Sequence, residues 1–163
     1  MVLQLNIFIL TRNHHQKVRG PQFLKTLVAD IGGTNSRLAV AKISRADKQI
    51  TLKNIQKFRN SDFNNFDEVI ETYLSSLDDH LINKICIAAA GIISETAVEM
   101  SNLNWKITVP SLQKAANIDE VLIINDLQAQ GYALDFIKSK DLETLIQGSH
   151  VPLPNNTKLV CGM

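Results

Sequence analysis

A pair of adjacent glycines, Gly32 and Gly33, joins two apolar runs, and this arrangement constrains the fold more than any other feature of the chain. The runs extend from Leu24 to Ala29 and from Leu38 to Ile43. Two extended segments joined by a short glycine turn predict a β-hairpin. Because glycine has no Cβ atom and readily adopts positive φ, we expect a tight turn whose backbone a ligand can approach closely.

The residues around this turn are suited to binding a nucleotide phosphate. Successive free N–H groups in a turn form a concave anion site, and Thr34 adds a hydroxyl donor. Asp30, at the end of the first predicted strand, supplies a hard oxygen ligand of the kind Mg²⁺ prefers. The alternative is that the glycines only reverse the chain, as glycine pairs in hairpins usually do.

Length and composition limit the classes of protein that fit. The chain has 163 residues, of which 45% are hydrophobic and 20% charged, as in an ordinary globular domain. Its net charge of +1 gives no basic field for nucleic acid, and the apolar run over 2–10 is too short to span a bilayer. Cys86 and Cys161 lie in apolar runs and fit a reducing compartment better than a disulfide framework. We therefore expect a cytoplasmic protein with no nucleic-acid or membrane partner.

Beyond the hairpin, strands alternate with helices, which predicts a mixed sheet with helices packed on it. One helix is predicted to begin after Asn65, with Glu68 as its capping partner and an apolar face from Phe66 to Leu77. The other predicted elements are a third strand over 49–58, a buried central strand over 85–93, a weaker strand over 96–100, a helix over 109–116, a strand over 121–124, a helix from 127 to about 138, further helical turns over 141–146 and a last strand over 158–161.

A second candidate site follows the predicted strand over 121–124. Asn125 and Asp126 lie where this strand ends and a helix begins, and ligands of α/β folds collect at that edge. A carboxylate there can act as a general base toward a hydroxyl. The alternative is that both residues only cap the helix. Trp105 follows Asn102 in a polar turn, and its ring either packs where two lobes meet or stacks on a sugar.

With these elements placed, the sequence resembles the amino-terminal half of a bacterial-type glucokinase, over about residues 24–162. This family belongs to the sugar kinase, Hsp70 and actin superfamily. The resemblance implies a small domain with a ribonuclease H-like (actin-like ATPase) α/β fold, followed by the truncated start of a large domain. It rests on the segments LVADIGGTNSRLAV at 27–40, SNLNW at 101–105 and IINDLQAQGYAL at 123–134.

The resemblance also implies roles for these residues. ATP and Mg²⁺ are the implied cofactors, and glucose or a similar hexose is the implied substrate. Asp30 would act through Mg²⁺, and Asp126 would accept the proton of the sugar 6-hydroxyl. Asn125 and Asn102 would bind the sugar. Arg37 would either steady the phosphates or pair with an acid, and both options stay open. The turn that would hold the phosphates, with the end of the strand before it, comprises Ala29, Asp30, Ile31, Gly32, Gly33, Thr34 and Asn35.

The resemblance leads us to expect an incomplete and inactive kinase. Residues 1–23 would be an extension, 24–110 a small phosphate-binding domain and 111–163 the beginning of the large domain. Exposed apolar surface would then favour self-association, a homodimer included. Ile92 also stands where the family has proline. Two alternatives are a non-catalytic binding module of the same fold and a member of the related sugar-responsive repressor group.

Overall fold

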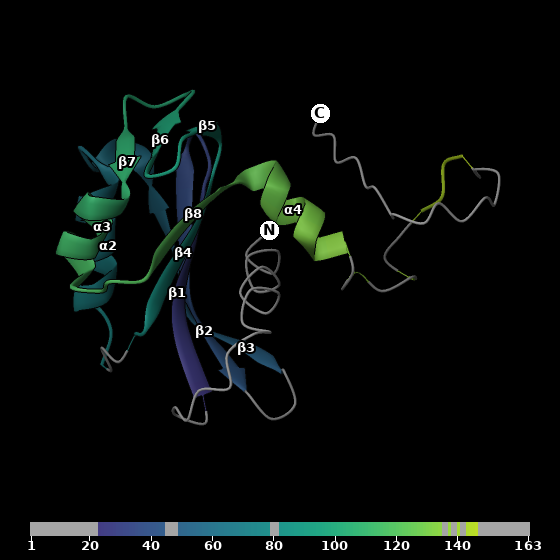
Figure 1. Ribbon diagram of the computed structural model, residues 1–163, viewed down its shortest axis with the longest axis horizontal. Helices are drawn as coiled ribbons and strands as arrows, with labels where there is room; N and C mark the ends of the chain where they lie inside the picture. Colours follow the sequence, from purple (N-terminus) through teal and green to yellow (C-terminus); the bar gives the residue numbers. More distant parts are fainter. Residues whose placement is uncertain are drawn as a thin grey trace.

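A computed structural model describes residues 23–44, 49–78, 82–134, 137, 140 and 143–146 (Figure 1). Within these residues the fold is α/β, with a five-stranded sheet in the order β3-β2-β1-β4-β8 and a three-stranded sheet in the order β5-β6-β7. The larger sheet consists of β1 (Phe23–Ile31), β2 (Asn35–Ser44), β3 (Ile50–Arg59), β4 (Lys84–Ala89) and β8 (Val121–Asn125). The smaller sheet consists of β5 (Gly91–Ile93), β6 (Ala97–Met100) and β7 (Lys106–Thr108). The helices are η2 (Asn60–Asp62), α2 (Phe66–Ser75), α3 (Val109–Ala116) and α4 (Asp126–Ala133).

The first three strands form the predicted antiparallel meander. β1 and β2 pair from Phe23 with Ser44 to Ile31 with Ser36, so residues 32–34 form the predicted hairpin turn. We expected Gly32 and Gly33 to use positive φ, and this expectation is wrong, because no glycine in the described residues has positive φ. The turn therefore needs glycine for its missing side chain rather than for a left-handed backbone.

The strands β1, β4 and β8 are parallel, and this pairing sets the position of the candidate site. Ile31 of β1 pairs with Ala89 of β4, and Ala89 pairs with Asn125 of β8. The carboxyl ends of all three strands therefore meet at one edge of the sheet. The mixed sheet with flanking helices that the sequence predicts is confirmed.

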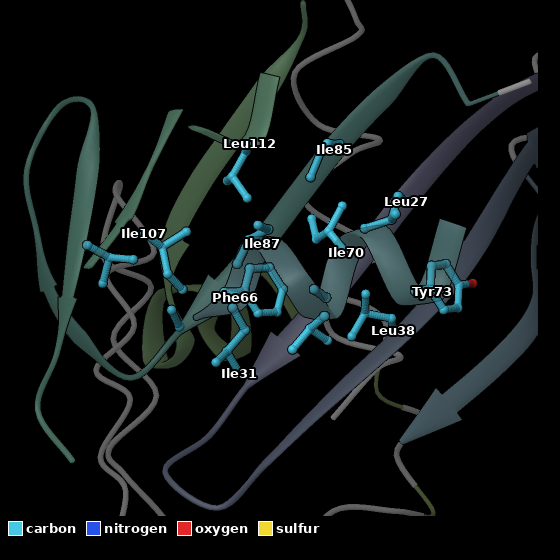
Figure 2. Close-up of a cluster of buried hydrophobic side chains, with 14 of the residues drawn as sticks. Leu27, Ile31, Leu38, Phe66, Ile70, Tyr73, Ile85, Ile87, Ile107 and Leu112 are labelled. Carbon is cyan, nitrogen blue, oxygen red and sulfur yellow. The ribbon is translucent and has the colours of Figure 1, made fainter. Parts of the chain in front are cut away.

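Helices α2 and α3 cover one face of the sheet, and α4 lies on the other side (Figure 1). Side chains of α2 pack on those of the strands in the larger core (Figure 2). The predicted start of α2 is confirmed, since the Asn65 side chain accepts a hydrogen bond from the Glu68 N–H at 3.0 Å. The largest fully buried side chains of this core are Tyr73, Phe66, Leu27, Ile31, Leu38, Ile70, Ile85, Ile87, Ile107 and Leu112.

The start of α3 and the other face of the sheet also follow from the sequence. Thr108 caps α3 by accepting from the Ser111 N–H at 3.1 Å, and Pro110 occupies the first turn as predicted. On the opposite face, β1, β2, β4, β8 and α4 share a smaller apolar cluster. Cys86 is buried in this cluster. In the described part of the chain, no helix has the length and apolar character needed to cross a membrane.

The long apolar run over 85–93 is not one strand, which corrects the prediction. β4 ends at Ala89, and the Ala90 N–H donates to the Ile31 carbonyl at 3.2 Å. The chain then enters the smaller sheet at Gly91, where β5 pairs with β6. Apolar character alone does not show where a buried segment passes from one sheet to another.

Several other boundaries differ from the predictions. β7 was not predicted, and α4 begins one residue earlier than expected, at Asp126. Residues 143–146 of the predicted turns over 141–146 are not helical. The predicted strand over 158–161, Cys161 and nearly all of the extension lie outside the described residues. The domain boundary at residue 110 stays a prediction, although β8, which follows it, pairs within the same sheet as β1.

Gly91 provides a test of how the two sheets join. A methyl group at this position would lie 2.3 Å from the carbonyl oxygen of Glu99, whereas one at Gly32 would lie 3.5 Å from its nearest neighbour, the Asn35 oxygen. We expect Gly91→Ala to lower the free energy of unfolding by about 1–3 kcal/mol. Chemical denaturation should show no such loss for Gly32→Ala. Equal stability of both variants would contradict the close approach of β5 to β6.

Candidate active site

Three segments that are far apart in sequence meet at the carboxyl edge of the parallel strands. The glycine turn follows β1, Asn125 and Asp126 form the junction of β8 with α4, and the turn over 101–104 joins β6 to β7. Gly33 lies directly against Asn102, because a methyl group at Gly33 would lie 3.2 Å from the Asn102 Cβ. The structure thus brings together the predicted phosphate-binding turn and a predicted sugar-binding residue.

The glycine turn keeps two backbone donors available. The Gly32 N–H donates to the Asn35 carbonyl at 3.1 Å and closes the turn. In the described part of the chain, the N–H groups of Gly33 and Thr34 make no backbone hydrogen bond. Thr34 is exposed and Gly33 is half-buried, so both groups are within reach of a ligand. Two neighbouring N–H donors are what an anion site in a turn requires.

Asn60 anchors this turn through hydrogen bonds to its backbone, and the sequence analysis did not identify this residue. Its side-chain NH₂ donates to the Gly32 carbonyl at 2.8 Å, and its backbone N–H donates to the Thr34 carbonyl at 3.0 Å. The Ser36 hydroxyl donates to the Asn60 side-chain oxygen at 2.8 Å. Nothing local in the sequence indicates these contacts, because Asn60 and Gly32 are 28 residues apart.

Asp30 is a buried carboxylate whose negative charge is only partly balanced by neighbouring groups. Its exposed fraction is 4%, and its Oδ2 atom has no hydrogen-bond partner. Arg37, its cross-strand neighbour, has Nη1 at 3.6 Å from Oδ2, which is an ion pair but too long for a hydrogen bond. Burial raises the pKa of Asp30 above the ordinary value, and the charge of Asp126 adds to this, while Arg37 opposes it. Of the two options for Arg37, the structure shows the pairing with an acid.

Asn125 and Asp126 differ in how they contact the start of α4. Asn125 is the N-cap of α4, since its Oδ1 accepts from the Leu127 and Gln128 N–H groups at 2.9 and 3.3 Å. This cap leaves the NH₂ group of Asn125 for a ligand. Asp126 is the first residue of the helix, and its Oδ1 also accepts from Leu127, at 2.9 Å. The cap therefore does not depend on Asp126, whose half-buried carboxylate can serve chemistry.

The separation of the two acids suits a ligand that touches both. Asp30 pairs with Ala88, and Ala88 pairs with Ile124, which lies two residues before Asp126. Two strand spacings put Ile124 about 10 Å from Asp30 across the sheet, and Asp126 lies further along, toward the carboxyl edge. The effect of Asp126 on the pKa of Asp30 also requires that the two carboxylates lie near one another.

The remaining predicted residues contribute less directly. Trp105 is buried in the larger core and its ring lies 6.3 Å from that of Phe66, so the packing role of Trp105 is the one observed. Ala29 and Ile31 are fully buried in β1, between β2 and β4, so they support the site rather than face a ligand. Asn35 is half-buried beside the turn.

A divalent cation fits the donors of this edge only if a ligand supplies the rest of its coordination. No group of three or more His, Cys, Asp or Glu side chains gathers in the described residues. The Asp30 carboxylate, whose Oδ2 atom lacks a hydrogen bond, is a hard donor. Mg²⁺ is commonly bound by one or two carboxylates together with substrate phosphates and water. The site therefore suits Mg²⁺ that arrives with a phosphate ligand.

Comparison with known proteins agrees with this geometry. The glucokinase family model matches residues 27–163. Glucokinase of Caulobacter sp. (strain K31) is 33% identical over 119 residues, which cover 73% of this chain and 36% of that protein. Glucokinase of Campylobacter jejuni subsp. doylei is 32% identical over 116 residues, which cover 71% of this chain and 33% of that protein. The chain thus spans about a third of the length of the curated relatives it matches.

A solved structure shows the same fold. The crystal structure of a glucokinase from an Antarctic psychrotroph superposes with a TM-score of 0.65 and 32% sequence identity, over 73% of this chain and 37% of that one. The similarity in fold accompanies a family match that runs from the glycine turn through the Asp126 segment. On these grounds the chain belongs to the glucokinase family.

Proposed function

We propose that this chain supplies one wall of an ATP-dependent glucose kinase site, in which the γ-phosphoryl group is transferred to the sugar 6-hydroxyl. The observation that carries the proposal is the shared edge of β1 and β8, which brings Asp30, the glycine turn and Asp126 together. Family membership supports the reaction class.

The glycine turn binds the phosphates in this proposal. The N–H groups of Gly33 and Thr34 donate to phosphate oxygens, and the Thr34 hydroxyl adds a third donor. Hydrogen bonds to a charged group contribute about 1.5–3 kcal/mol each. Because β1 and β2 hold both ends of the turn, the donors are oriented before the ligand arrives.

Asp30 would hold Mg²⁺ through its carboxylate, directly or through water. Bound Mg²⁺ neutralises charge on the phosphates and favours attack on the γ-phosphorus. Arg37 favours the ionised form of Asp30 and opposes the rise in pKa that burial causes. The raised pKa of Asp30 marks a carboxylate whose charge the folded chain does not fully compensate, and a cation would complete the compensation.

Asp126 acts as the general base in this proposal. It accepts the proton of the 6-hydroxyl as the sugar oxygen attacks phosphorus. The NH₂ group of Asn125, at the end of β8, and the side chain of Asn102, in the turn between β6 and β7, bind the sugar. Phosphoryl transfer depends mainly on positioning and charge, so a base placed beside the phosphates is the main chemical group the chain needs to supply.

The first prediction concerns the cation. We expect the chain to bind ATP more tightly with Mg²⁺ than without it, and Asp30→Asn to abolish that difference. Asp78→Asn is a matched control, because Asp78 is an exposed acid in the segment that follows α2. Calorimetric titration with and without Mg²⁺ gives both affinities. An unchanged Mg²⁺ effect in Asp30→Asn would rule out Asp30 as the metal-binding residue.

The second prediction uses the pH dependence of stability. Because burial raises the pKa of Asp30, the native state holds this proton more tightly than the unfolded state does. The free energy of unfolding should therefore fall as pH rises from the unfolded pKa, about 3.9, through the raised native pKa. Asp30→Asn should remove this loss and stabilise the chain at neutral pH.

Asp126→Asn is the contrasting variant for this experiment. Asp126 lies in the first turn of α4, where a negative charge stabilises the helix. Its loss should lower stability at neutral pH by about 0.3–1 kcal/mol. Urea unfolding between pH 3 and pH 8 measures both effects. A lower stability of Asp30→Asn at neutral pH would contradict the incomplete compensation of Asp30.

The third prediction concerns turnover. Kinases of this kind close two lobes around their substrates, and the chain spans about a third of its curated relatives. Well-oriented reactions gain roughly 7–11 kcal/mol from alignment, so we expect no measurable glucose phosphorylation by the chain alone. A coupled assay with ATP and glucose tests this. Turnover by the chain that Asp126→Asn abolishes would contradict this prediction, because it would show that this part of the site catalyses the reaction without a second lobe.

A further inference from the structure

Asn60 makes two hydrogen bonds to the backbone of the glycine turn. Its NH₂ group donates to the Gly32 carbonyl at 2.8 Å, and the backbone N–H of Asn60 donates to the Thr34 carbonyl at 3.0 Å. Both contacts come from η2, which directly follows β3. Two carbonyls of the turn are thus drawn toward one residue.

Peptide geometry turns these contacts into a constraint on the donors. In a planar trans peptide, the carbonyl of one residue and the N–H of the next point in opposite directions. No peptide bond in the described residues is cis. When Asn60 binds the Gly32 carbonyl, the Gly33 N–H must point away from Asn60. The same relation holds for the Thr34 carbonyl and the N–H of Asn35.

The orientation of Asn60 is itself fixed. Its exposed fraction is 2%, and the Ser36 hydroxyl donates to its side-chain oxygen at 2.8 Å. Because the oxygen accepts from Ser36, the NH₂ group is the part that faces Gly32. A carboxylate in the same place would put an oxygen against the Gly32 carbonyl, and the two would repel.

We infer that Asn60 is a positioning residue that aims the Gly33 N–H at the phosphates of the bound nucleotide. This inference rests on the proposed function of the glycine turn. An outward carbonyl would repel a phosphate, whereas an outward N–H attracts it. Asn60 therefore selects the peptide orientation that binds anions, although its own side chain is buried behind the turn.

The test compares three asparagine variants of the chain by titration with Mg·ATP. Asn60→Asp and Asn60→Ala should each weaken binding at least tenfold, the loss expected for a donor to a charged group. In ¹⁵N spectra, the Gly33 amide signal should move in the free variants and lose its response to Mg·ATP. Asn65→Ala is the matched control, because Asn65 caps α2 and its loss should lower stability by about the usual cost of a cap without weakening binding.

The control separates positioning from stability. If Asn65→Ala and Asn60→Ala weaken binding equally, the effect comes from stability and the inference is wrong. If the Asn60 variants do not fold, Ser36→Ala replaces them, since it frees the Asn60 side chain and should weaken binding in the same direction. If the original chain binds Mg·ATP and these variants bind it equally tightly, the role of Asn60 is wrong, while the proposed function of the glycine turn stands. No binding of Mg·ATP by the original chain would overturn the proposed function and this inference together.

Discussion

The parallel pairing of β1, β4 and β8 is the constraint on which the site depends. Ile31, Ala89 and Asn125 stand in one row across the sheet, so the segments that follow β1 and β8 emerge at one edge. A shift of β8 by one residue would turn its side chains to the opposite faces. The buried side chains of Val28, Cys86 and Ile124 oppose such a shift because they share one apolar cluster.

The site combines a rigid scaffold with one poorly compensated charge. The glycine turn is closed by its own backbone and held by Asn60, so its free donors do not have to be organised by a ligand. Asp30 is different, since it is buried with an atom that lacks a hydrogen bond. Natural proteins often retain such costs where function needs them. The buried charge and the oriented donors together favour a ligand that carries both phosphate and cation.

Much of this fold could be predicted from local sequence. The hairpin follows from two apolar runs around glycine, the start of α2 from Asn65 with Glu68, and the start of α3 from its early proline. Each of these signals acts within a few residues. The break of the apolar run at Ala90 could not be predicted in this way, because it depends on contacts with Ile31 and with β6.

The candidate site shows the same division. Asp30 lies one residue before the end of β1 and Asp126 directly follows β8, so their shared edge follows from the rule for parallel sheets. The glycine turn and the value of its missing Cβ atoms were also predicted, but the close approach of Asn102 to Gly33 was not. Asn60 escaped prediction because its partners come from β2 and the turn, far away along the chain.

The convergence of these segments on one ligand can be measured by replacing Mg²⁺ with paramagnetic Mn²⁺ in a complex of the chain with ATP. Amide signals near the ion broaden in ¹⁵N spectra. The account predicts broadening at Gly33, Asn102 and Asp126 together, with Asp78 unaffected. Broadening that reaches the glycine turn but leaves Asp126 sharp would contradict a single site shared by the two strand ends.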